Sequence, residues 1–178
     1  LVVFKTNSIY AIVGDDPDTW EVRLIDASVG CVAPASIVPA GGSLYWWGEQ
    51  GPARWGGSGA PEWIGIPLIT ATLAPTVLSA VAADNLKISG AWDLVRQRVM
   101  WAVPEVSKTR NTLILPFNDL LQRFESDKWD PMDVASMAVV QDANGQPWVM
   151  LGGYSGQVFK WWNASNDGVP SGTASGTF

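Results

Sequence analysis

Two places in the chain put tryptophans side by side at the end of an apolar run. The runs are "SLYWWG", which contains Trp46 and Trp47, and "GQVFKWW", which contains Trp161 and Trp162. Neighbouring side chains on a β-strand point to opposite faces of the sheet, and an indole ring is costly to leave in water on either face. The sequence therefore predicts strands that are covered on both faces.

Short apolar runs separated by turn residues recur along the whole chain. Runs rich in β-branched and aromatic residues, with glycine, asparagine or aspartate between them, are typical of antiparallel strands joined by short turns. The Asn144-Gly145 pair between two such runs is the strongest hairpin signal. One short helix is expected in "APTVLSAVAADNLK", residues 74–87, and the remaining pattern predicts an all-β fold.

The individual runs also indicate how the strands are exposed. In "TWEVRLI", Trp20, Val22 and Leu24 fall on one side and two charged residues on the other, which is typical of a half-exposed or outer strand. With the two runs before it, this segment predicts a three-stranded meander. Farther along, "DLVRQRVMWAVP", residues 93–104, and "LLQRFES", residues 120–126, are each expected to supply strand.

A β-propeller accounts for these strands better than a β-sandwich does. A sandwich leaves one face of each sheet in water, whereas "LVVF", "LYWW" and "WVML" carry bulky apolar residues on both faces. The radially stacked sheets of a propeller cover both faces of every inner strand. At roughly 40 to 50 residues per blade, residues 1–162 hold about three to four blade modules. Residues 163–178 are expected to be a polar loop or linker.

The expected blade count suggests that the chain is a segment of a longer polypeptide. Propellers typically have about four to eight blades, so this chain holds at most the smallest complete ring. The first residue, Leu1, also lies inside an apolar run and not in a polar lead-in.

The composition excludes several classes of function. Lys and Arg total 11 against 17 Asp and Glu, so the chain has a net charge of -6 and lacks the basic patches that grip nucleic-acid phosphates. There is no histidine, and Cys31 is the single cysteine, so no intrachain disulfide can form. The best membrane candidate, residues 69–83, is short and contains Pro75. We therefore expect no catalysis, no cofactor and no membrane insertion.

Acidic clusters are the remaining candidates for site chemistry. Asp15, Asp16 and Asp18 in "GDDPD" lack the ligand spacing of an EF-type calcium loop and fit ordinary turn chemistry. Glu125 and the two aspartates that follow it are the type of residue used in glycoside hydrolysis, but sequence proximity does not place them across a pocket. The expectation is a solvated turn and no metal site.

Most of the tryptophans are expected to pack in the core. Blade packing is predicted for those in strand runs, namely Trp46, Trp47, Trp148, Trp161 and Trp162. Trp55 and Trp63 are flanked by glycine and proline, and we expect them to be partly exposed. They are the candidates for an intersubunit or ligand surface. Cys31 is expected to be a small buried hydrophobic residue.

Several phrases of the sequence resemble one protein family. They are "LVVFKTNSIYAIVGDDP", "GCVAPASIVPAGGSLYWWGEQGPARWGG", "VMWAVP" followed by "NTLILPFN", and "KWDPMDVASMAVVQDANGQPWVMLGGYSGQVFKWW". Together they resemble the propeller-bearing tail proteins of tailed bacteriophages, which are the tail hub, nozzle or head-closure proteins below the portal. The resemblance covers most of the chain.

This resemblance implies a structural role in the virion tail. It implies a homo-oligomeric ring that joins capsid to tail, contacts other tail or portal-adjacent proteins and lines a conduit for DNA. An acidic wall would then let the genome slide without sticking, although negative charge also serves solubility alone. The alternative is a carbohydrate-binding propeller, which Trp55 and Trp63 favour.

Overall fold

The computed structural model of the chain describes residues 1–65, 87–104, 108–125 and 133–161. These residues form four small antiparallel β-sheets, which confirms the predicted all-β class. Two short 3-10 helices, Pro17–Thr19 and Pro34–Ser36, are the helical elements in this part of the chain, which has no α-helix. The helix expected at residues 74–87 lies outside the described residues except for Lys87.

Each sheet is a meander of strands that follow one another in sequence. The first sheet contains β1 (Val2–Phe4), β2 (Ile9–Val13) and β3 (Glu21–Asp26). The second sheet contains β4 (Val38–Ala40), β5 (Ser43–Gly48), β6 (Gly51–Trp55) and β7 (Glu62–Trp63). The third sheet contains β8 (Ser89–Asp93), β9 (Arg98–Pro104), β10 (Asn111–Asn118) and β11 (Arg123–Phe124). The fourth sheet contains β12 (Val134–Gln141), β13 (Pro147–Gly153) and β14 (Val158–Lys160).

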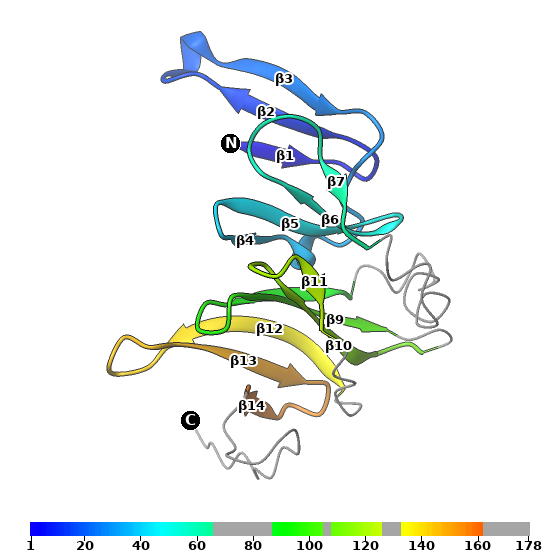
Figure 1. Cartoon of the computed structure of the whole chain (residues 1–178), viewed down its shortest axis with the longest axis vertical. Helices are drawn as coiled ribbons and strands as arrows, with labels where there is room; N and C mark the ends of the chain where they lie inside the picture. Colours follow the sequence, from blue (N-terminus) through cyan, green and yellow to red (C-terminus); the bar gives the residue numbers. More distant parts are fainter. Residues whose placement is uncertain (66–86, 105–107, 126–132, 162–178) are drawn as a thin grey trace.

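The four sheets are stacked one after another along the long axis of the molecule (Figure 1). Three buried hydrophobic clusters lie between them. In chain order they fill the first interface (first and second sheets), the second interface (second and third sheets) and the third interface (third and fourth sheets). Strand β8 contacts β4 of the sheet before it and β12 of the sheet after it. The described residues form an open series of sheets and not a closed propeller.

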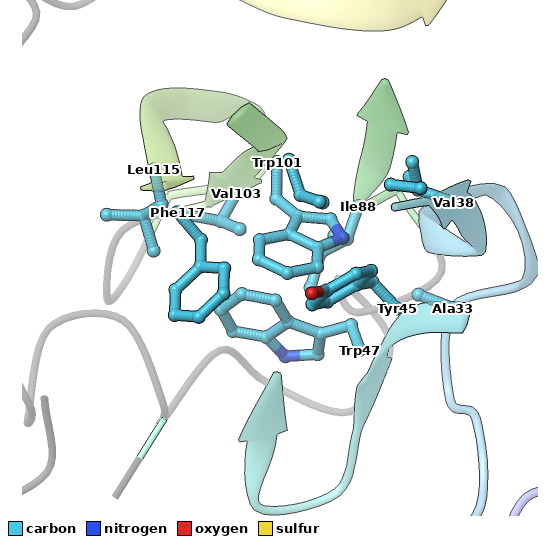
Figure 2. Close-up of a cluster of buried hydrophobic side chains, with 11 residues drawn as sticks. Ala33, Val38, Tyr45, Trp47, Ile88, Trp101, Val103, Leu115 and Phe117 are labelled. Carbon is cyan, nitrogen blue, oxygen red and sulfur yellow. The ribbon is translucent and has the colours of Figure 1, made fainter. Parts of the chain in front are cut away.

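Trp46 and Trp47 show how a middle sheet is covered on both faces. Trp46 is fully buried against the first sheet, where its ring centroid lies 5.0 Å from that of Phe4. Trp47 is buried against the third sheet, with its ring 6.1 Å from that of Trp101. Figure 2 shows Trp47, Trp101, Tyr45 and Phe117 gathered in that second interface. The prediction of strands covered on both faces is confirmed at this pair.

Trp161 lies in the third interface, between the third and fourth sheets. It is 6% exposed and packs in a cluster with Met100, Ile114 and Leu151. Its neighbour Trp162 lies outside the described residues, as does the expected linker at 163–178.

The turn predicted at Asn144 and Gly145 is confirmed, but the sequence prediction missed a turn within residues 93–104. Asn144 and Gly145 connect β12 to β13, and Gly145 has a φ of 75°, which glycine adopts without strain. By contrast, residues 93–104 do not form one strand, because the chain turns between β8 and β9. The Asp93 carboxylate accepts a hydrogen bond of 3.2 Å from the Arg96 backbone N–H, and Gln97 takes a φ of 55°. These local features end the strand.

The segment 120–126 contains less strand than expected. Leu120 and Leu121 lie in a turn and are exposed by 74% and 57%, respectively. The Asn118 side chain accepts a hydrogen bond of 3.0 Å from the Leu121 backbone N–H, and this bond closes the turn. The strand that follows, β11, is limited to two residues.

Candidate interaction surface

The outward face of the first sheet is apolar and uncovered among the described residues. Cross-strand pairing places Val3, Tyr10 and Leu24 on this face, together with Ile12 and Val22. Leu24 is 55% exposed and Val22 is 65% exposed. We call these five residues the first end face. The opposite face of the same sheet packs into the first interface through Phe4 and Ile9, among others.

The outward face of the fourth sheet has the same character. Its register pairs Val140 with Trp148, and Met150 with both Ala138 and Lys160. Val158 also lies on this face, opposite Gly152, and it is 41% exposed, while Val140 is 50% exposed. We call this set the last end face, with members Ala138, Val140, Trp148, Met150, Val158 and Lys160.

Trp148 is held in a fixed position on the last end face. Its indole N–H donates a hydrogen bond of 3.1 Å to the Asp142 carboxylate, and the Lys160 ammonium lies 3.4 Å from its ring centroid. Hydrogen bonds from the Gln146 backbone and from this indole lower the pKa of Asp142. No described sheet packs on this outward face, so the blade packing of Trp148 stays a prediction.

Apolar faces at both ends of the stack form a candidate surface for assembly. Contiguous exposed apolar patches on a folded protein mark sites of protein association. Inside this molecule, faces of the same kind are buried by the next sheet at each of the three interfaces. The end faces are therefore suited to pack against further β-sheets.

Trp55 and Trp63, the predicted surface residues, lie on neither end face. Both are half-buried and pack against the cluster of the first interface. The Trp55 indole N–H donates a hydrogen bond of 3.0 Å to the Gly59 carbonyl oxygen. The Trp63 ring lies so close to Gly48 that a Cβ at this glycine would be 2.6 Å from it. Partial exposure is confirmed for both rings, and each also contacts the core.

A polar cluster joins the second and third sheets beside the second interface. The Tyr45 hydroxyl donates a hydrogen bond to the Asp119 carboxylate, 74 residues away in sequence. Arg54 donates a hydrogen bond to Gln122 and forms a 2.7 Å ion pair with Glu62. Burial, together with the hydrogen bond to Asp119, raises the pKa of Tyr45 to about 12. The cluster connects the β10–β11 turn to β5 and β6.

Of the acidic residues considered for site chemistry, Asp16 and Glu125 have structural partners, and Asp15 and Asp18 are exposed. The Asp16 carboxylate accepts hydrogen bonds from the backbone N–H groups of Asp18 and Thr19 and so caps the first 3-10 helix. Glu125 forms a 2.9 Å ion pair with Arg98. Asp127 and Asp130 lie outside the described residues. Within the described ranges, no group of three or more acidic, cysteine or histidine residues is arranged to hold a metal ion.

Cys31 is buried, as the sequence predicted, with 8% of its surface exposed. Its thiol donates a hydrogen bond of 3.2 Å to the Ala33 carbonyl oxygen, and burial raises the pKa of this thiol. In the described part of the chain, no helix has the length and apolar character needed to span a membrane.

Comparisons with protein-family models and with curated proteins gave no match to this chain. The first end face had a partial signal in the sequence, because the alternation through Val22 and Leu24 indicated an outer strand. The last end face had no such signal, since residues 137–140 are apolar at consecutive positions.

Proposed function

We propose that this chain is a structural component of a tailed-phage virion. In this proposal the four sheets are blades of a β-propeller in a tail hub, nozzle or head-to-tail connecting protein, which surrounds the path of the DNA. The observation that carries the proposal is the stack of four meander sheets with one apolar face open at each end. The sequence phrases that resemble tail proteins supply the link to the virion.

The stacking supports a propeller because the sheets have the strand order and the face-to-face packing of propeller blades. Every described sheet is an antiparallel meander in sequence order, and successive sheets meet through their faces. Propeller blades are arranged in this way, typically four to eight to a ring. On this proposal the two end faces are where the series continues into further blades or neighbouring tail subunits.

The acidic composition supports a conduit better than a nucleic-acid-binding surface. A net charge of -6 gives a wall that repels phosphate groups at short range, so DNA passes without strong adhesion. No catalytic group is required for this role, which depends on shape, assembly and charge.

Purified particles of a phage that encodes this chain test the proposal directly. We expect the chain in the tail fraction, in a fixed stoichiometry with portal and tail proteins, by quantitative mass spectrometry. We also expect antibody labels against the chain to lie below the portal in electron micrographs. Absence of the chain from purified particles would overturn the proposal.

A pair of variants separates assembly from folding in the same experiment. Val22→Asp places a charge on the first end face, whereas Arg23→Asp changes the charge of a residue on the same strand whose side chain is exposed and points to the other face. We expect Val22→Asp to fold but to be lost from particles, while Arg23→Asp is incorporated. Equal incorporation of the two would remove the end face from the proposal.

A further inference from the structure

The β8–β9 turn and the β10–β11 turn of the third sheet are built in the same way. In the first, the Asp93 carboxylate accepts a hydrogen bond of 3.2 Å from the Arg96 backbone N–H. In the second, the Asn118 side chain accepts one of 3.0 Å from the Leu121 backbone N–H. Both turns lie at the same end of the sheet, because β9 pairs with β8 along one edge and with β10 along the other.

Each of these turns also contains a glutamine in the left-handed conformation. Gln97 has a φ of 55° and Gln122 a φ of 50°, the two positive values outside glycine in the described part of the chain. The Gln97 side chain donates to the Leu94 carbonyl oxygen at 2.8 Å, and the Gln122 side chain donates to that of Asp119. The Asp119 N–H donates to the Gln97 carbonyl oxygen at 2.9 Å and joins the turns. Both are therefore held in place, so contact with a partner costs little conformational entropy.

The tips of the two turns are aliphatic and exposed. Leu94 is 51% exposed, Val95 60%, Leu120 74% and Leu121 57%. We call these four residues the twin-turn patch. Turn tips are usually polar, and clustered exposed apolar side chains mark sites of protein association. The patch shares no residue with either end face.

The charge that the patch offers to a partner is positive. Asp93 is buried and forms a 3.1 Å ion pair with Arg96, and the Asp119 carboxylate accepts a hydrogen bond from the Tyr45 hydroxyl. Both acids are thus engaged within the molecule. Arg123 follows the second turn and is exposed, and among the described residues its guanidinium has no ion pair. A complementary surface has apolar groups beside a free carboxylate.

The β2–β3 turn of the same chain has this complementary chemistry. Trp20 is 60% exposed, and Asp15 and Asp18 on the same turn are exposed. The carboxylates of these two residues have no partner in the described ranges. The turn is itself rigid, because Asp16 and Thr19 form a capping box around its 3-10 helix. It presents an indole ring beside two free carboxylates.

Within one molecule, the β2–β3 turn and the twin-turn patch lie on the same side of the stack and cannot meet (Figure 1). They belong to the first and third sheets, which are roughly 20 Å apart at the usual spacing of packed sheets. Between them on that side lies the β6–β7 connection, residues 56–61, with the sequence "GGSGAP". This connection is small and uncharged, so it leaves room for a second molecule to approach.

We propose that this side of the stack binds a second copy of the chain, about a two-fold axis that passes near the β6–β7 connection. The Trp20 ring of each copy packs on the twin-turn patch of the other, with Asp15 and Asp18 beside Arg123. A two-fold axis makes each contact twice, and this doubling brings a small contact closer to the area that a stable dimer needs. Elsewhere, the net charge of -6 opposes contact between copies, whereas here opposite charges meet. The dimer uses neither end face and does not depend on the virion assignment.

Sedimentation equilibrium of the full 178-residue chain tests this dimer. We expect a dimer with a dissociation constant of about micromolar order, weakened by added salt. The double variant Leu120→Ser/Leu121→Ser should weaken it by about tenfold or more, because both side chains lose apolar contact area. Its fold should be unchanged by circular dichroism, since both residues are exposed. Leu24→Ser, which alters an equally exposed leucine on the first end face, is the matched control and should leave the dimer intact.

Mixing two variants identifies which surfaces meet. Trp20→Ser keeps the twin-turn patch, and Leu120→Ser/Leu121→Ser keeps the tryptophan, so a mixed dimer regains one complete contact. We expect an equimolar mixture to associate more strongly than either variant alone. A patch that packed on its own copy would give no such gain.

A charge exchange tests the ionic part of the contact. Arg123→Asp should weaken the dimer by about fivefold, and Asp18→Arg in the same chain should restore it. A wild-type chain that stays monomeric to about 100 µM would overturn the proposal. So would a mixture without gain, or a dimer that Leu24→Ser disrupts and the double leucine variant does not, because that dimer would form through the end faces.

Discussion

Among the described residues, Tyr45 has the ionisation most strongly tied to the fold. Its side chain is completely buried in the second interface, and its hydroxyl donates to Asp119 in the β10–β11 turn. Burial favours the neutral phenol and raises the pKa of Tyr45 to about 12, from an ordinary value of 10. The folded state therefore retains this proton at a pH where the unfolded chain has lost it. Stability from this group is fully present below pH 10 and is lost as pH rises toward about 12.

Comparison with Tyr45→Phe isolates this contribution. We expect the difference in unfolding free energy between the wild type and Tyr45→Phe to be constant below about pH 10. Above that pH the wild type should lose up to about 2 to 3 kcal/mol relative to the variant. Urea denaturation between pH 8 and 12 measures the difference, and the variant corrects for the lysines that titrate in the same range. A difference that stays flat to pH 12 would contradict the buried environment of the hydroxyl.

At the scale of elements, two adjacent residues of β3 place their side chains on opposite faces of the first sheet. Leu24 is on the first end face and is 55% exposed, whereas Ile25 packs against the cluster of the first interface. Both are large aliphatic side chains on the same strand. Their substitution therefore compares the two faces with the strand held constant.

Leu24→Ser and Ile25→Ser are expected to differ in their effect on stability. Leu24→Ser should change the unfolding free energy by about 0.5 kcal/mol or less, because the side chain is already largely in water. Ile25→Ser should lower it by about 2 kcal/mol or more, since it removes buried methyl groups and adds a hydroxyl to an apolar cluster. Thermal or urea unfolding of the isolated chain gives both values. Equal losses would show that the first end face is covered in solution.

At the scale of the whole molecule, the charge predicts how the chain meets DNA. With a net charge of -6, the isolated chain should bind duplex DNA negligibly at physiological salt, and residual binding should vanish as salt rises. Fluorescence anisotropy with a labelled random duplex measures this. A sub-micromolar dissociation constant under these conditions would contradict the conduit, because a wall that grips phosphates would stall the DNA.

The sequence by itself determined the class of the fold and some of its local features. Adjacent tryptophans at positions 46 and 47 required a strand covered on both faces, since side chains on a strand alternate and neither ring is stable in water. The hairpin at Asn144 and Gly145 was equally local, because a positive φ is favourable at glycine. The buried state of Cys31 also followed from residue type.

Only the tertiary structure decided which faces are covered and which stay open. Trp148 and Trp161 have similar settings in the sequence, yet one lies on the last end face and the other is buried in the third interface. The partners that bury a side chain come from a neighbouring sheet, tens of residues away, as Asp119 does for Tyr45. The alternation of side chains along a strand shows that its two faces differ in polarity. The order of the sheets in space determines which of those faces is covered by a neighbouring sheet.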